Sequence, residues 1–146
     1  MKPLAEQLLD AQQCGVYQSV RTAGEVERAA QAAGLNVFRL DLRNARDKNG
    51  FLSEIAKALN FPDYFRSNWD ALDECLRDLN WLPAKTGFVL IFENAEHFRM
   101  ARKDFEVAVD VLDSAAESWK SEGRPFWALF ARSKLSDYGL RNWPTL

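Results

Sequence analysis

The chain has 146 residues, of which 47% are hydrophobic, and its formal net charge is −2. This length can bury a continuous core, the composition is ordinary for a globular protein, and so small a net charge says little about partners. No apolar run approaches the roughly 20 residues that span a bilayer, which disfavours a membrane protein. Glu6 and Asp10 interrupt the first apolar pattern, which is typical of an amphipathic helix rather than of a secretory signal. We therefore expect a cytoplasmic protein.

Hydrophobic periodicity predicts helices and strands that alternate along the chain. We expect, in chain order, a helix at residues 4–12, a strand at 16–20, a helix at 24–33, a strand at 37–42, helices at 51–59 and 68–79, a strand at 88–92, a helix at 102–120 and a strand at 126–130. The runs FVLIF and FWALF are apolar at every position, which is typical of strands buried on both faces of a parallel sheet. This order of elements indicates an α/β layer fold with right-handed crossovers.

The two ends of the chain add to this core. Residues 16–20 are too short and too polar to stand alone, so we expect the first 34 residues to supply a helix, an edge strand and another helix to the sheet. No linker rich in Pro, Gly or Ser separates them from the rest, which favours a single domain over residues 1–146. The sequence leaves open whether the tail, DYGLRNWPTL, packs on the body or extends into solvent.

A search for enzyme chemistry finds little. His97 is the only histidine, and the only cysteines, Cys14 and Cys75, lie far from it in the sequence and form no CxxC pair. Glycine-rich phosphate loops, HExxH motifs and EF-hand loops are all missing from the sequence. We expect a protein without enzymatic activity, cofactor or metal. A buried Cys75 that packs as a small hydrophobe is the favoured interpretation of that residue.

The most informative segment spans residues 61–83, FPDYFRSNWDALDECLRDLNWLP. Apolar residues recur in it at helical spacing, and Asn68, or Ser67 before it, is a good N-cap residue, so a helix is predicted to begin near Asn68. Between Pro62 and Asn80 there are five acids and two bases. Such a local negative charge favours a cationic partner and disfavours nucleic acid, because it would repel phosphate.

The same acidic face has an ordinary structural interpretation. A charged outer helix face is usually only solvated, and Asp73 with Arg77, four residues later, predicts a common surface ion pair. Aromatic residues before the helix, Tyr64 and Phe65, can equally be buried or contact a partner. The residue pattern alone leaves both interpretations open.

The run LNFPDYFRSNWDALDECL resembles the barstar family, intracellular inhibitors of the secreted ribonuclease barnase. The family pattern is Leu-x-x-Pro-Glu/Asp-Tyr-aromatic, followed by Asn, Asp-Ala-Leu and Asp-Cys-Leu, and a less specific similarity extends over residues 35–131. The resemblance implies a barstar-like α/β layer fold with a small parallel three-stranded sheet packed by helices. Residues 35–131 would form its core, with an amino-terminal extension at 1–34 and a carboxy-terminal tail at 132–146.

The resemblance also implies roles for single residues. The family's binding-loop tyrosine corresponds to Tyr64, its first helix acid to Asp70, its dominant acid to Glu74 and its structural cysteine to Cys75. Four positions depart from the family pattern, which has Asp at Glu74, Trp at Asp73, Gly at Asp78 and an acid at Ser118, beside Glu117. The complete set of expected partner-binding residues is Tyr64, Phe65, Asn68, Asp70, Asp73, Glu74 and Asp78.

The function implied by the resemblance is inhibition of a ribonuclease. An acidic helix and the aromatic loop before it would bind and block the active site of a barnase-like enzyme, because carboxylates can occupy a basic site built for phosphate. The alternative is a barstar-fold interaction module that binds a different cellular protein. Both interpretations predict a protein partner and neither needs nucleic acid, a membrane or a cofactor.

Overall fold

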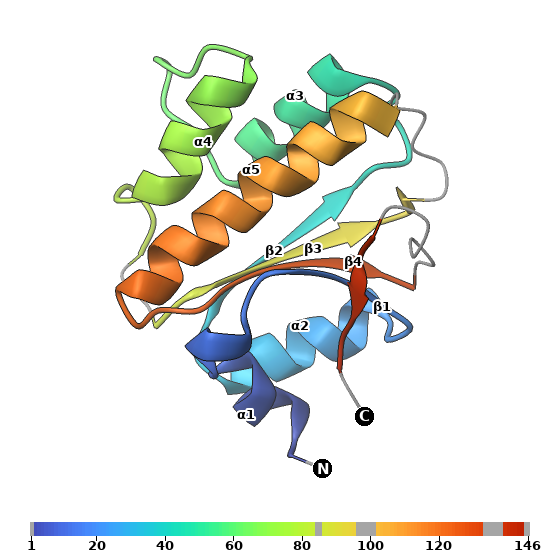
Figure 1. Cartoon of the computed structure of the whole chain (residues 1–146), viewed down its shortest axis with the longest axis vertical. Coiled ribbons are helices and arrows are strands. Elements are labelled where there is room, and N and C mark those ends of the chain that lie inside the picture. The colour runs from blue at the N-terminus through green and yellow to red at the C-terminus, as the bar shows by residue number, and fades with distance from the viewer. Residues whose placement is uncertain (1, 84–85, 96–101, 133–138, 145–146) are drawn as a thin grey trace.

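The computed structural model describes residues 2–83, 86–95, 102–132 and 139–144 (Figure 1). Its helices are α1 (Leu4–Leu8), the short 3-10 helix η1 (Ala11–Gln13), α2 (Ala23–Ala32), α3 (Lys48–Ala58), α4 (Trp69–Asp78) and α5 (Arg102–Ser121). Its strands are β1 (Val16–Ser19), β2 (Asn36–Asp41), β3 (Phe88–Glu93), β4 (Phe126–Ala131) and β5 (Arg141–Asn142). Among the described residues, no helix combines the length and the apolar character that crossing a membrane requires.

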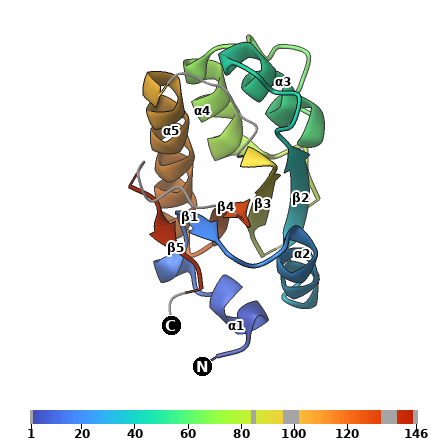
Figure 2. The same ribbon diagram turned by 90° about the vertical axis from the view of Figure 1, so that its right-hand side faces the viewer.

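The strands form one parallel sheet in the order β2-β3-β4-β1-β5. Figure 2 shows this order across the sheet, from β5 on the left to β2 on the right. The expectation of an α/β fold with a parallel sheet is confirmed. The expectation of three strands is wrong, because β1 and β5 extend the sheet beyond β4 to five strands.

The amino-terminal strand was expected at the edge of the sheet, but it lies inside the sheet. β1 is paired with β4 on one side and with β5 on the other, so the carboxy-terminal segment covers the edge that β1 would have exposed. The Trp143 N–H donates to the Gln18 carbonyl at 2.9 Å, and the Gln18 amide donates to Asn142 Oδ1 at 2.8 Å. Residues 139–144 of the tail therefore pack on the body of the molecule.

Helices cover both faces of the sheet. α3, α4 and α5 lie on one face, and α1 and α2 lie on the other (Figures 1 and 2). Under the first layer, Phe51, Phe92 and Phe130 stack in sequence at 5.8 and 4.7 Å between ring centroids. On the opposite face the Trp127 indole donates to the Leu8 carbonyl at 2.8 Å, which ties α1 to the central strand β4.

Side-chain caps explain where the helix boundaries differ from expectation. The helix expected at residues 4–12 is interrupted because the Asp10 carboxylate accepts from the Gln12 N–H at 3.0 Å and starts a separate 3-10 turn. α3 begins before residue 51 because Asp47 caps it through the Gly50 N–H at 2.8 Å. α2 begins at a capping box in which Thr22 and Glu25 each bond to the other's backbone.

Candidate functional site

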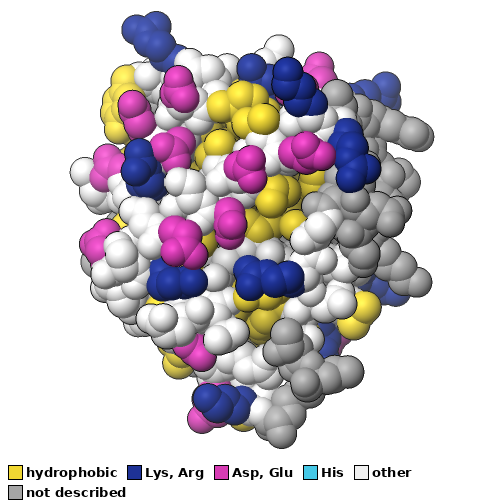
Figure 3. All heavy atoms as spheres, viewed as in Figure 1, with side chains coloured by type: hydrophobic (Ala, Val, Ile, Leu, Met, Phe, Trp, Pro, Cys, Tyr) yellow, Lys and Arg dark blue, Asp and Glu magenta, His cyan; other side chains and the backbone are white. Residues whose placement is uncertain are grey.

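The acidic helix α4 lies on the outside of the helical layer. Leu72, Cys75 and Leu76 are buried, and the Trp119 indole of α5 donates to the Leu76 carbonyl at 2.8 Å. The apolar stripe predicted from the sequence thus faces α5, and the charged side of α4 is left exposed. Figure 3 shows acidic side chains spread over the face that α4 and α5 form, with apolar side chains between them.

An aromatic cluster holds the loop that leads into α4. The Phe65 ring packs edge-on against Phe61 at 4.9 Å, and Phe61 packs edge-on against Trp81 at 5.8 Å. The Trp81 indole donates to the Leu59 carbonyl at 2.9 Å, which joins this cluster to the end of α3. Phe65 is therefore a half-buried anchor, whereas its neighbour Tyr64 is 66% exposed.

The start of α4 agrees with the prediction from the sequence. The Asn68 side-chain oxygen accepts from the Ala71 N–H at 2.7 Å, so Asn68 is the N-cap and the helix begins at Trp69. Asp70 lies in the first turn, where its negative charge meets the positive end of the helix dipole. Asn68 therefore contributes to the site by fixing where α4 starts.

Five of the seven expected residues line one hollow in the surface. Its volume is about 240 Å³, and its lining residues are Tyr64, Phe65, Arg66, Asn68, Asp70, Ala71, Glu74 and Cys75. The carboxylates of Asp70 and Glu74 are one helical turn apart and exposed, and neither forms an ion pair with a residue in the described ranges. The hollow therefore combines an exposed aromatic ring with two carboxylates that are open to a partner.

The other two expected residues do not line this hollow. Asp73 forms the predicted ion pair with Arg77, at 2.9 Å between Oδ2 and a guanidinium nitrogen. Asp78 is exposed at the last residue of α4, just before Leu79 takes a left-handed conformation. Both acids contribute charge to the face around the hollow without forming its wall.

Sequence reasoning did not assign Arg66, Ala71 and Cys75 to the hollow. Ala71 and Cys75 each follow one of the exposed acids by a single residue, and they are four residues apart, so they share a strip of the helix surface. That spacing could have identified them. Nothing in the sequence pattern distinguishes Arg66 from any other loop arginine, so its position depends on the fold of the loop.

Burial and nearby negative charge raise the pKa of two groups that line the hollow, the Cys75 thiol and the Tyr64 hydroxyl. Burial raises the pKa of the Cys75 thiol, and the negative charges of Asp78 and Glu74 raise it further. Cys75 is 3% exposed, which confirms its expected role as a small buried side chain. Partial desolvation, followed by the charges of Cys75, Asp78 and Glu74, raises the pKa of Tyr64, so its hydroxyl remains a hydrogen-bond donor at neutral pH.

Of the residues considered for catalysis, the two cysteines lie in the described part of the chain, and both are buried. His97 lies outside the described residues. Cys14 is buried, and its sulfur lies 3.8 Å from the Ala116 carbonyl oxygen. Within the described ranges, no three His, Cys, Asp or Glu side chains are grouped closely enough to hold a metal ion.

Comparison with known proteins identifies a family and a wider fold similarity. The family described as Barstar (barnase inhibitor) matches residues 35–131. No curated protein sequence matches the chain. Among solved structures, the ORC2 protein of Aeropyrum pernix in its ADPNP-ADP complexes is 19% identical with a TM-score of 0.59, over 92% of this chain and 41% of the other.

A second structure, Cdc6p from Pyrobaculum aerophilum, is 14% identical with a TM-score of 0.58, over 94% of this chain and 38% of that one. The ADP form of the Aeropyrum pernix ORC2 protein is 18% identical with a TM-score of 0.57, over 92% and 40%. The chain thus spans about two fifths of the proteins that it resembles in structure. At this identity the likeness shows a shared fold and nothing more.

Proposed function

The chain belongs to the barstar family, and we propose that it binds and blocks the active site of a barnase-like ribonuclease through α4 and the loop before it. The observation that carries this proposal is the hollow in which exposed Tyr64 meets the unpaired carboxylates of Asp70 and Glu74. A ribonuclease must direct basic donors at a scissile phosphate. A carboxylate on a rigid helix can occupy that site and offers no bond to cleave.

The proposal divides the seven residues by what each does. Glu74 and Asp70 take the place of substrate phosphates, and Tyr64 supplies the exposed apolar contact around which water is excluded. Phe65 and Asn68 hold the loop and the helix start in position. Asp73 and Asp78, which lie outside the hollow, add to the negative field that accelerates encounter with a basic surface. Inhibition in this scheme needs binding alone and no catalytic step by the chain.

A second candidate is an interaction module that binds a different cellular protein through the same face. It is favoured by Arg66, which also lines the hollow and adds a positive charge to it. The extra methylene of Glu74 and the side chain of Asp78 also change the face relative to the pattern that this family uses. A partner with both acidic and basic groups would fit such a surface.

One experiment distinguishes the two candidates. The purified chain is titrated into a barnase-like ribonuclease from the same source, RNA cleavage is followed, and the chain is used in parallel to capture binding proteins. We expect inhibition at a one-to-one ratio, lost in the double variant Asp70→Asn, Glu74→Gln and kept in Asp73→Asn. Capture of a protein that is not a ribonuclease, with the same dependence on Asp70 and Glu74, would favour the interaction module.

A further inference from the structure

A second cavity lies at the carboxyl ends of the central strands. α2 follows the carboxyl end of β1 on one face of the sheet, whereas α5 follows that of β3 on the other face, and β4 lies between these two strands (Figure 1). Strands whose following helices diverge in this way leave a crevice at their carboxyl ends, and ligands of open α/β sheets bind there. A cavity of about 380 Å³ occupies this position, and its lining residues in the described ranges are Ala23, Glu93, Asn94, Ala131 and Arg132.

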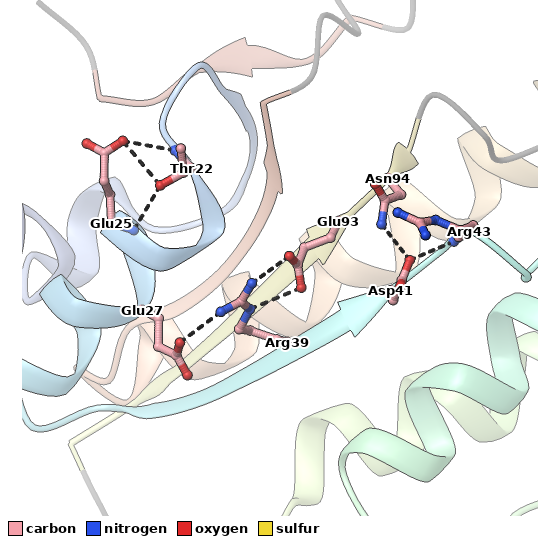
Figure 4. A network of polar contacts seen from close by, with 8 residues as sticks. All are labelled: Thr22, Glu25, Glu27, Arg39, Asp41, Arg43, Glu93 and Asn94. Carbon is pink, nitrogen blue, oxygen red and sulfur yellow. Dashed lines mark hydrogen bonds and ion pairs between the residues drawn. The ribbon is translucent and has the colours of Figure 1, made fainter.

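Among the described residues that line this crevice, one cation has no counterion in the described part of the chain. Arg39 donates to both oxygens of Glu93, at 3.0 and 2.6 Å, and also to Glu27 at 3.1 Å (Figure 4). Arg21 pairs with Glu25 at 3.3 Å. Arg132 is exposed and forms no ion pair with any residue that the structure describes. Within the described ranges, the wall of the crevice thus offers one guanidinium without an ion pair, that of Arg132, beside a Glu93 carboxylate that is already paired.

The other polar group of the crevice is the amide of Asn94. Its nitrogen donates to Asp41 Oδ1 at 2.7 Å, which holds the side chain in place. A carboxamide has two N–H donors and a carbonyl acceptor, so Asn94 retains a donor and an acceptor for a ligand hydroxyl. Asn94 and Arg132 both have left-handed backbones, with φ of 61° and 51°, and such non-glycine conformations concentrate at binding sites.

The start of α2 makes this crevice a poor site for a polyphosphate. The Thr22 N–H donates to a Glu25 carboxylate oxygen at 3.2 Å, and the Glu25 N–H donates to the Thr22 hydroxyl at 3.1 Å (Figure 4). The chain thus places its own carboxylate at the end of the helix where a phosphate would otherwise be attracted. Arg132 is the one cation among the described lining residues, so the crevice favours a ligand with one negative charge over a ligand with several.

We propose that this crevice binds a small monocarboxylate that carries a hydroxyl group. The carboxylate pairs with the Arg132 guanidinium, whose planar fork matches two carboxylate oxygens, and the hydroxyl bonds to the Asn94 amide. This site is separate from the hollow on α4, and the proposal stands whether or not the chain inhibits a ribonuclease.

The test is a titration of the isotope-labelled full chain with lactate, followed by the backbone amide signals of Ala23, Asn94 and Arg132. The comparison probes are lactamide, propionate, inorganic phosphate and ADP. Lactamide keeps the hydroxyl and lacks the charge, whereas propionate keeps the charge and lacks the hydroxyl. We expect saturable shifts with lactate, binding of lactamide and propionate that is at least about tenfold weaker, and no saturation with phosphate or ADP.

Two variants and a control assign the contacts. Arg132→Gln should weaken lactate binding at least about tenfold and give lactate and lactamide equal affinities. Arg46→Gln, at an exposed arginine that is not among the described lining residues, should leave both affinities unchanged. Glycine tolerates the left-handed backbone at position 94, so Asn94→Gly should keep the fold and give lactate and propionate equal affinities. Three outcomes would overturn the proposal. The unaltered chain could bind lactate and lactamide equally, the Arg132 and Arg46 variants could lose the same affinity for lactate, or ADP could saturate the same signals.

Discussion

At the scale of single residues, α4 carries two kinds of carboxylate next to each other in the sequence. Asp73 is paired with Arg77, and 27% of its side chain is exposed. Glu74 is exposed, has no ion pair in the described part of the chain and lines the hollow. Neighbouring helical residues point about 100° apart, which follows from 3.6 residues per turn. The two acids therefore form a matched pair for testing the binding face.

The first prediction uses that pair. Under the proposed function, Glu74→Ala should weaken binding to the ribonuclease by at least about 2 kcal/mol, and Asp70→Ala by a comparable or smaller amount, as is typical of desolvated charges at an interface centre. Asp73→Ala should weaken it by less than about 1 kcal/mol, because it loses only a peripheral charge. Calorimetric titration measures the binding. Thermal melts check that each variant loses less than roughly 1 kcal/mol of stability. A loss for Asp73→Ala equal to that for Glu74→Ala would contradict the assigned roles.

The second prediction concerns Glu25 and pH. The backbone hydrogen bond from Thr22, and then the Arg21 side chain, hold the pKa of Glu25 below its ordinary value of 4.5. Because the folded state favours the carboxylate, its contribution to stability is present above the pKa of the unfolded chain and disappears as the pH falls through the folded pKa. Glu25→Gln should therefore melt at a lower temperature than the unaltered chain at pH 7. Melts recorded at decreasing pH should converge in acid, and a gap that persists there would argue against the charge as the cause.

At the scale of elements, the binding face depends on where α4 begins. The aromatic cluster of Phe61, Phe65 and Trp81 fixes the loop. Asn68, at the end of this loop, caps α4, so the helix begins at the next residue. Leu79 ends the helix in a left-handed conformation with φ of 50°. The positions of Asp70 and Glu74 therefore follow from the two ends of one short helix.

The third prediction tests the cap. Asn68→Ala should lower the free energy of unfolding by about 1 kcal/mol, because the Ala71 N–H loses its side-chain acceptor. Asn68→Asp should keep most of the stability, since a carboxylate accepts the same bond and also suits the positive helix end. Urea denaturation of the three proteins measures the difference. Equal losses in both variants would show that Asn68 acts through something other than its cap.

At the scale of the whole molecule, the residues outside the family match complete the core of those inside it. Trp127 of β4 is fully buried, and three residues help to enclose it. Its indole donates to the Leu8 carbonyl, and the rings of Tyr17 and Trp143 lie 5.5 and 5.8 Å from it between centroids. All three come from the ends of the chain. Without them, β4 would be an open edge and its indole would face water.

The fourth prediction follows from this arrangement, and it tests the expectation that residues 1–146 form one domain. A fragment of residues 35–131 should lack cooperative unfolding and show poorly dispersed amide signals, because it loses β1, β5 and the cover of Trp127. The full chain should unfold in a single transition under the same conditions. A fragment that melts cooperatively near the temperature of the full chain would mean that the ends are an appendage.

The sequence by itself determined the features that depend on a few consecutive residues. Spacings and side-chain types within one element account for the stripe of α4, its Asn68 cap, the Asp73–Arg77 pair and the buried runs at 88–92 and 126–130. Only the tertiary structure decided that the sheet has five strands, that β1 lies inside it, and that Asp73 and Asp78 stand outside the hollow. A two-residue strand such as β5 has no periodicity to detect, and it exists only because Gln18, more than a hundred residues earlier, supplies its hydrogen-bond partners.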